Sequence, residues 1–299
     1  MEDIHSVKAY HKISPTAKMV AYWRSLSDIP FSKEIADAVG AEETTTQMLG
    51  DKIFIMAHSS PLIMEARYKA IDQGLKKLPA AGVMELACGL SPRGLALAGN
   101  NIRYVGTDLP GMLSESAPVI SELAAEAGIP GEYLHFCPVN VLDKSALEAA
   151  ADLFEDEPFN ICNEGLLMYL DKEEKATMAQ HIRALLARSG GVWITTDIMF
   201  NNLRNELLWS LPELKKIIES TLGSISRQVE RDIAGNDFES EAEAMRFYKE
   251  LGFRVEQYPF YDGSYRLSTL QGLPEVMKGL FLHILSKTHA WILKPIHAS

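Results

Sequence analysis

The N-terminal part of the chain carries the hydrophobic pattern of helices. Between residues 15 and 26, apolar residues recur at helical spacing. Ser14 is placed to cap that helix, and Pro15 suits its first position, where the missing N–H costs no hydrogen bond. A further helical stretch covers residues 53–78. The pattern predicts a helical N-terminal cap over residues 1–78.

Beyond this segment, short apolar runs alternate with amphipathic helices. The runs that have the length of buried strands cover residues 82–87, 103–108, 133–141, 159–163, 192–196, 253–256 and 288–293. This alternation predicts an α/β domain over residues 79–299, built on a seven-stranded, mostly parallel sheet with helices on both faces. The last strand suits an antiparallel hairpin at the sheet edge. Residues 200–238 break the rhythm, which predicts a helical insertion after the fifth strand, over the site.

Composition narrows the classes of partner. The 299 residues carry a formal net charge of −11, from 40 acidic and 29 basic side chains, which disfavours nucleic acid because its binders usually show a basic face. The N-terminus lacks a signal-peptide pattern, and no apolar run reaches the roughly 20 residues of a membrane span. The three cysteines form no CxxC pair, which favours a reducing compartment. We expect a cytoplasmic protein with neither nucleic acid nor membrane as partner.

Residues with binding chemistry follow several of the predicted strands. Glu85 and Gly89 follow the first strand, Asp108 the second, Asn140 the third and Glu164 the fourth. In doubly wound sheets, ligands bind beyond the carboxyl ends of the strands, near the point where the strand order reverses. The pattern therefore predicts a ligand site to which these residues contribute.

The loop after the first strand departs from a dinucleotide-binding loop. That motif would read GxGxxG, whereas Ala87 takes the first glycine position here and Pro92 the third. Proline lacks an N–H and makes a poor phosphate cradle, yet it suits the first turn of a helix capped by Ser91. A nucleoside ligand without phosphates tolerates that helix start, and S-adenosylmethionine is such a ligand.

Asp108 allows two interpretations. It lies near the distance after the loop at which an acid accepts hydrogen bonds from ribose hydroxyls, and one carboxylate can accept from both hydroxyls. Alternatively, it is a turn residue before Leu109-Pro110. The strand, the loop and the acid taken together favour the ribose role.

Other reactive side chains also have a structural interpretation. Glu164 fits an acid at a helix N-terminus, and Tyr169 fits packing under the following helix as well as contact with a substrate. Cys88, Cys137 and Cys162 fit small apolar fillers. The eight histidines show no metal-ligand spacing, and the chain has neither a GxSxG motif nor an evident nucleophile–base pair.

Four motifs along the chain form one set. Residues 14–17 read S-P-T-A in a helix that continues to Arg24, residues 65–72 contain A-R-x-x-x-I-D, and residues 108–110 read D-L-P. The most specific motif is E-G-L-L-M-Y-L at residues 164–170. This set resembles the leucine carboxyl methyltransferase superfamily and, more narrowly, its bacterial O-methyltransferases linked to polyketide biosynthesis. The resemblance covers most of the chain and implies a class I Rossmann-like methyltransferase fold.

The resemblance also implies which residues would bind S-adenosylmethionine, with S-adenosylhomocysteine as product and no metal. Arg67 would pair with the methionine carboxylate through its bidentate fork, and Glu164 would contact the methionine amino end. Asp108 would hold the ribose, while Asn140 and Val141 would lie by the adenine. The full expected cofactor set is Arg67, Glu85, Ala87, Cys88, Gly89, Asp108, Leu109, Asn140, Val141, Glu164 and Gly165.

Two departures from the family pattern matter, one in the loop after the first strand and one at Asn140. The loop reads A-C-G-L-S-P-R at residues 87–93, where the family typically has G-A-G-L-D-T-R, and Asn140 stands where the family often has Asp. Ala87 therefore adds a methyl group where the backbone approaches the ligand. Asn140 can still accept a hydrogen bond from the adenine amino group.

The chemistry implied is simple. Methyl transfer from a sulfonium is an in-line displacement, so positioning and desolvating the acceptor oxygen can suffice. A carboxylate acceptor is ionised at pH 7 and needs no base, whereas a hydroxyl would be helped by one. Tyr169, the candidate catalytic residue, and residues 200–238 are expected to border the pocket of a small-molecule acceptor. The alternatives are a non-catalytic S-adenosylmethionine-binding regulatory protein and, less favoured, an NAD-dependent oxidoreductase.

Overall fold

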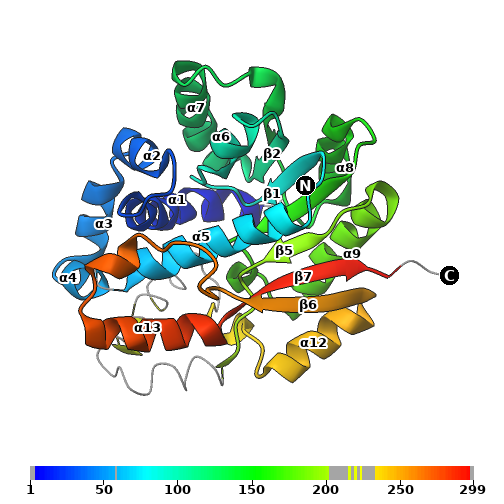
Figure 1. The fold of residues 1–299 in the computed structure, drawn as a ribbon. Helices are drawn as coiled ribbons and strands as arrows, with labels where there is room; N and C mark the ends of the chain where they lie inside the picture. The colour runs from blue at the N-terminus through cyan, green and yellow to red at the C-terminus, as the bar shows by residue number, and fades with distance from the viewer. Residues whose placement is uncertain are drawn as a thin grey trace.

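A seven-stranded mixed sheet forms the centre of the molecule (Figure 1). The computed structural model describes residues 4–57, 59–201, 215–216, 219–220, 223 and 233–296. The strands are β1 (Gly82–Leu86), β2 (Arg103–Asp108), β3 (Leu134–Pro138), β4 (Phe159–Asn163), β5 (Trp193–Thr195), β6 (Phe253–Pro259) and β7 (His289–Pro295). Neighbouring strands pair in parallel except where β7 pairs antiparallel with β5 and β6. The expected Rossmann-like α/β fold with an antiparallel last strand is confirmed.

The strand order places a reversal of winding at β1. The order is β3-β2-β1-β4-β5-β7-β6, so β1 lies between β2 and β4. The chain runs from β1 through β2 to β3 on one side, and then crosses to β4 on the other side. A crevice forms beyond the carboxyl ends of parallel strands at such a reversal, and doubly wound proteins bind ligands there. The loops that follow β1, β2 and β4 are therefore brought to one place.

Helices cover both faces of the sheet (Figure 1). The faces hold different cores, because successive strand residues such as Val83 and Met84 point to opposite sides. Met84 packs in one core with α8 (Lys144–Ala151), α9 (Lys172–Ser189) and α12 (Glu241–Glu250). Val83 packs in the other core with Ile71 and Leu75 of α5 (Ser60–Lys77). Two further helices, α6 (Arg93–Ala98) and α7 (Pro110–Glu126), flank β2 and β3.

Among the helices that precede β1, the first begins earlier than the sequence pattern predicts. They are α1 (Ile4–Ser25), α2 (Ser32–Ala38), α3 (Ala41–Leu49), α4 (Lys52–Met56) and α5. The prediction that Ser14 caps the first helix is wrong, because α1 runs through Ser14 and Pro15. Proline removes one hydrogen bond from a helix and need not end it. The division of the chain into two domains at residue 78 stays a prediction.

Local signals explain several helix boundaries. Asp171 caps α9 in a capping box with Glu174, and Asp143 caps α8 by accepting the N–H groups of the first turn. Gly128, with φ +66°, follows the end of α7 in the left-handed conformation that commonly ends a helix. Each of these residue types satisfies backbone groups that a helix end leaves unpaired.

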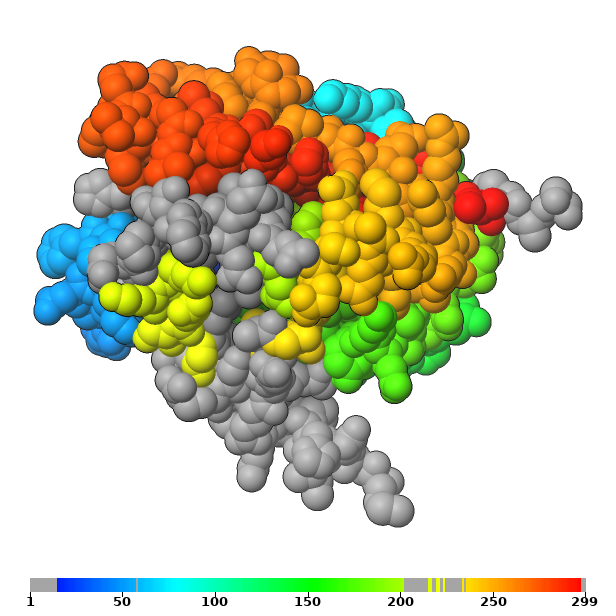
Figure 2. Space-filling model, turned by 90° about the horizontal axis from the view of Figure 1, so that it is seen from below, coloured from blue at the N-terminus to red at the C-terminus, as the bar shows by residue number. Residues whose placement is uncertain are grey.

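Most of the predicted insertion, residues 200–238, lies outside the described residues. Its described end holds η4 (Ala234–Asn236) and Phe238, whose carbonyl accepts the Asn201 N–H at 2.9 Å. The chain then forms α12 and β6, and returns through α13 (Glu275–Lys287) to β7. Both α13 and α12 are visible on the face of the molecule that is seen from below in Figure 2.

Candidate functional site

The turn after β1 places residues with left-handed backbone at the carboxyl end of the parallel strands. Ala87 has φ +51° and Gly89 has φ +54°. Between them, the Cys88 N–H donates to the Thr107 carbonyl of β2 at 2.9 Å, so the turn stays tied to the sheet. Glycine adopts this conformation freely, whereas it costs alanine about 1 kcal/mol. The turn leaves Ala87 and Gly89 partly exposed, with strain at Ala87.

Asp108 lies directly across from this turn, at the end of β2. Its carboxylate accepts the Gly89 N–H at 2.8 Å and the Leu109 N–H at 2.7 Å. Burial raises the pKa of Asp108 to about 6, although the two N–H groups act in the opposite direction. The side chain thus joins the ends of β1 and β2, and its ionisation falls within the physiological range.

Glu164, at the end of β4, is surrounded by guanidinium groups from three helices. Arg24 of α1 approaches one carboxylate oxygen to 3.0 Å, Arg67 of α5 approaches the other to 3.8 Å, and Arg93 of α6 lies at 3.9 Å. Burial pushes the pKa of Glu164 up, but these cations outweigh it and hold the pKa below its ordinary value. Although the Glu164 side chain is only 3% exposed, neither oxygen accepts a hydrogen bond within the described residues.

Arg67 is held between the ends of β4 and β5. Besides its contact with Glu164, its Nη2 donates to Asp197 at 2.8 Å. Its side chain is 20% exposed, which makes it more open than either carboxylate. Arg67 therefore sits at the strand ends with part of its surface accessible, as its expected role requires.

Glu85 and Arg93 form a buried ion pair beneath the turn. The Arg93 guanidinium donates to Glu85 and, at 2.9 Å, to Asp72 of α5, and it lies over the Tyr68 ring. The second Glu85 oxygen accepts the Tyr104 hydroxyl at 2.7 Å. The structure thus engages the Glu85 carboxylate in a network under the turn.

The remaining expected cofactor residues divide by exposure. Cys88 and Val141 have buried side chains, and burial raises the pKa of the Cys88 thiol well above its ordinary value. Leu109 is partly exposed just before α7. Asn140 is exposed in a turn, where its side-chain oxygen accepts the Leu142 N–H at 3.0 Å. Of these four, Asn140 and Leu109 have side chains that are at least partly exposed, whereas the N–H and the carbonyl of Cys88 are both engaged, with Thr107 and Ser91.

Tyr169 ends the short helix η3 (Leu167–Tyr169), five residues after Glu164. Burial raises the pKa of Tyr169 to about 12, and the nearby Thr16 hydroxyl of α1 acts against this rise. The charged groups that also act on its pKa are those of the strand ends, namely Asp197, Asp108 and Arg67. The phenol therefore belongs to the same site, and near neutral pH it is a hydrogen-bond donor rather than a base.

The structure brings Arg67, Asp108, Glu164 and Tyr169 together as the sequence predicts, and it adds residues that the sequence reasoning missed. Asp197 follows β5 just as Asp108 follows β2, so the strand-end rule that found Asp108 applies to it as well. Arg24 and Arg93 lie within helices, and their spacing in sequence does not reveal a shared acidic partner. Tertiary packing alone places them beside Glu164.

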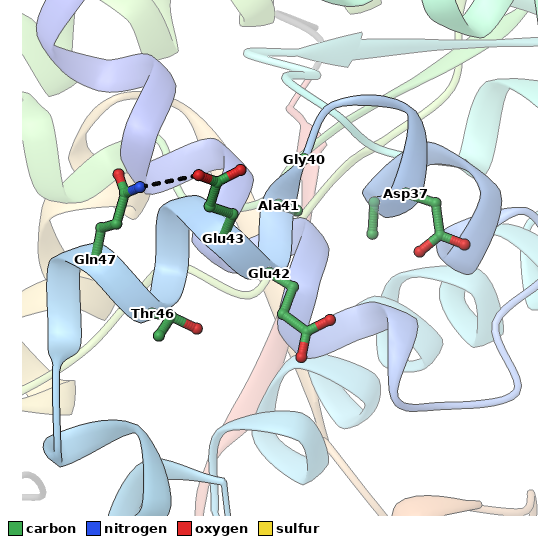
Figure 3. Close-up of a pocket in the computed structure, with 8 residues that line it drawn as sticks. Asp37, Gly40, Ala41, Glu42, Glu43, Thr46 and Gln47 are labelled. Carbon is green, nitrogen blue, oxygen red and sulfur yellow. Dashed lines mark hydrogen bonds between the residues drawn. The ribbon is translucent and has the colours of Figure 1, made fainter.

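The described residues also bear on other kinds of site. A hollow of about 560 Å³ at the turn between α2 and α3 is lined by Asp37, Glu42 and Glu43, and Gln47 donates to Glu43 at 3.1 Å (Figure 3). The described residues contain no group of three His, Cys, Asp or Glu side chains suited to a metal ion. Among the same residues, no helix combines the length and apolarity that crossing a membrane requires.

Comparison with known proteins yields structural likeness without a family. No family model and no curated protein matches the chain. The chain is similar to magnesium protoporphyrin IX methyltransferase (ChlM) from Synechocystis PCC 6803, solved with bound SAH, at 15% identity and a TM-score of 0.46 over 80% of this chain and 87% of that one. It is similar to an O-methyltransferase family protein from Burkholderia thailandensis at 15% identity and a TM-score of 0.45, over 85% and 63% of the two chains. At these identities and scores, activity and substrate have to be argued from the site.

Proposed function

We propose that this chain is an S-adenosylmethionine-dependent methyltransferase that acts on an oxygen, a carboxylate or a hydroxyl, of a small molecule. One observation carries the proposal: at the strand ends a buried carboxylate, Glu164, is ion-paired with arginines but accepts no hydrogen bond within the described residues, and it lies beside a partly exposed guanidinium, Arg67. An α-amino acid bears an ammonium group and a carboxylate on one carbon, which suits this pair. Asp108 adds an acceptor for a ribose diol, and S-adenosylmethionine carries all three groups.

The residues present fit that cofactor. Glu164 would accept the ammonium hydrogens that its two oxygens lack, and the surrounding arginines keep it ionised for this task. Arg67 would pair with the methionine carboxylate, and Asp108 would accept the ribose hydroxyls. The partly exposed backbone of Ala87 and Gly89 would lie against the methionine portion. Asn140 is exposed at the β3 end, where the adenine amino group would need an acceptor.

The protein's part in the chemistry is to position and desolvate. S-adenosylmethionine, when bound, supplies a methyl group activated on a sulfonium. Tyr169 lies on the loop after Glu164 and would donate a hydrogen bond toward the acceptor, because a phenol with a pKa of about 12 stays protonated near pH 7. A side chain in that state cannot serve as a base. This favours an acceptor that is already ionised, namely a carboxylate.

The proposal includes a family and a setting. Membership of the leucine carboxyl methyltransferase superfamily is supported by the four sequence motifs, of which residues 164–170 supply both Glu164 and Tyr169 to the site. A cytoplasmic location is supported by the three cysteines, which are far apart in sequence and form no CxxC pair. A small-molecule acceptor without nucleic acid is supported by the net charge of −11.

Calorimetric titration with S-adenosylmethionine, S-adenosylhomocysteine and NAD tests the proposal. We expect both adenosyl ligands to bind and NAD to leave the protein unaffected. Arg67→Met should weaken binding of S-adenosylmethionine about 10- to 100-fold, because it removes charge-assisted hydrogen bonds. Binding of NAD alone would overturn the proposal. Adenosyl binding with no turnover on a panel of carboxylates and phenols would favour a regulatory protein.

Arg103→Met is the matched control for this experiment. Arg103 is similarly exposed, at 27%, and is also paired with an acid, since its Nη1 lies 3.3 Å from Glu155. It stands at the opposite, amino-terminal end of β2, away from Asp108. We expect its replacement to leave ligand affinity unchanged. An equal loss of affinity in both variants would indicate a general loss of folding, which thermal unfolding of each variant would reveal.

A further inference from the structure

Asp197, two residues beyond the last residue of β5, holds more partners than any other strand-end acid described above. Its side chain is 3% exposed. One oxygen accepts the Gly165 N–H at 2.7 Å and Arg67 Nη2 at 2.8 Å. The other accepts the Asn163 amide at 2.6 Å and the N–H groups of Leu166 and Leu167 at 2.7 and 3.2 Å. Both oxygens are thus engaged by donors, and the carboxylate is nearly closed to solvent.

Three of these donors are successive backbone N–H groups of one loop. Gly165 has φ +84°, and this left-handed residue lets the chain turn so that its N–H and the next two point toward the same acceptor. Glu164 begins this loop, and η3, which ends in Tyr169, follows it. One carboxylate therefore ties three consecutive backbone groups of this loop to the end of β5.

The Arg67 contact joins a second element to the same carboxylate. Arg67 comes from α5, on one face of the sheet, and also faces Glu164 at 3.8 Å. Without Asp197, the guanidinium would keep Glu164 as its nearest described acid but would lose the hydrogen bond that orients it. Orientation matters here because a planar guanidinium binds a carboxylate in a fixed fork geometry.

We propose that Asp197 is a positioning residue that couples the Arg67 guanidinium, on the cofactor side, to the loop carrying Tyr169, on the acceptor side. This inference rests on the proposed function, because it assigns Arg67 to the cofactor. Asp197 does not act as a base: its oxygens are engaged by five donors and its side chain is almost fully buried. Its part is to fix two groups that contact ligands, in one geometry.

The test compares Asp197→Asn with Glu65→Gln. Glu65 of α5 is an unusually close match, because it too is a buried carboxylate with five donors: Lys69, and the N–H and hydroxyl groups of Ser268 and Thr269. Those partners belong to the segment at η5 (Thr269–Gly272) rather than to the strand ends. Both replacements turn an acceptor oxygen into an amide group, so both should lower the thermal unfolding temperature.

Affinity and amide hydrogen exchange separate the two variants. We expect Asp197→Asn to weaken S-adenosylmethionine binding about tenfold and to speed exchange at Gly165, Leu166 and Leu167, while Glu65→Gln changes neither. The loss of affinity should not add to that of Arg67→Met: the double variant should bind within about twofold of Arg67→Met alone, because Asp197 acts through Arg67. Asp197→Glu, which keeps the charge, should restore part of the affinity.

The outcomes distinguish this inference from the function on which it rests. Wild-type protein that fails to bind S-adenosylmethionine overturns the proposed function. If the wild type binds, three outcomes overturn the role of Asp197 and leave the proposed function standing. Asp197→Asn leaves the affinity unchanged, Glu65→Gln weakens it equally, or the losses add in the double variant. If Asp197→Asn does not fold, Asp197→Glu takes its place. A longer side chain at this position should then weaken binding about threefold, and unchanged binding contradicts the proposal.

Discussion

The two faces of the sheet bury different chemistry. Under α8, α9 and α12 the core is aromatic and aliphatic, with Trp193 and Trp291 fully buried and Met178 packed among them. Under α5 and α6 the same depth of burial holds the ion pair of Glu85 with Arg93. The sheet thus separates an aromatic and aliphatic core from a face whose apolar cluster around Val83 also holds this buried ion pair, here called the charged core.

Apolar burial and buried charge differ in what they contribute to stability. Apolar burial stabilises a fold directly, whereas charges taken out of water must regain in pairing what they lose in hydration, and often do not. The charged core lies directly behind the strand ends, where Arg93 also faces Glu164. Stability does not require this arrangement. If the site binds its ligand as proposed, this ion pair would fix the charge and orientation of the groups there.

The largest effect should come from breaking the charged core. Arg93→Met leaves Glu85 buried without its cation, and Arg93 is itself only 1% exposed, so we expect a loss of about 3–5 kcal/mol in the free energy of unfolding. Adding Glu85→Gln, which keeps an acceptor for Tyr104, should recover part of this loss. Urea denaturation of both variants measures it.

The apolar face supplies the contrast. Met178→Ala should cost a comparable amount, about 2–5 kcal/mol, through a cavity. Its affinity for S-adenosylmethionine should be preserved, whereas that of Arg93→Met should fall. If Arg93→Met proved as stable as wild type, the charged core would not be a strained network, and the comparison of the two faces would lose its basis.

A smaller effect should follow the ionisation of Asp108. Its pKa of about 6 means that the carboxylate is mostly protonated at pH 5 and mostly ionised at pH 7. If the ionised form holds the ribose, binding of S-adenosylmethionine should tighten about tenfold between these pH values. Glu164, whose pKa is lowered, stays ionised throughout this window. Calorimetry across the range measures the slope, and Asp108→Asn should remove it.

Stability should respond to pH in the opposite sense. Because the folded protein raises the pKa of Asp108, the associated stability is present below pH 3.8 and is lost as the pH rises through about 6. Affinity should therefore rise over the same interval in which this contribution to stability falls. A slope in affinity that persists in Asp108→Asn would assign the titration to another group.

The sequence alone predicts the sheet better than the site. Every strand lies close to its expected position, because buried runs bounded by turns have few alternative structures, and β2 matches residues 103–108 in full. The strand-end rule also predicts Asp108 and Glu164. It does not predict that Glu85 would pair with Arg93, since an ion pair between a strand and a helix depends on packing. Likewise, α1 begins before Pro15 because tertiary contacts with α2, α3 and α5 override the local start signal at Ser14 and Pro15.

The smallest effect should come from Ala87, where the turn after β1 carries strain beside the core under α8, α9 and α12. Ala87→Gly removes a Cβ from left-handed backbone and so relieves strain in the folded protein. We expect this relief to exceed the entropic cost of the more flexible glycine in the unfolded chain, and the free energy of unfolding to rise by about 0.5–1 kcal/mol. If the methyl group also crowds the ligand, S-adenosylmethionine should bind a few-fold tighter. Thermal unfolding and calorimetry of the same variant separate the two effects, because strain relief alone raises stability without changing affinity. The Ala87 methyl group also packs against the apolar core under α8, α9 and α12. A variant less stable than wild type would show that this packing stabilises the protein by more than the strained backbone destabilises it.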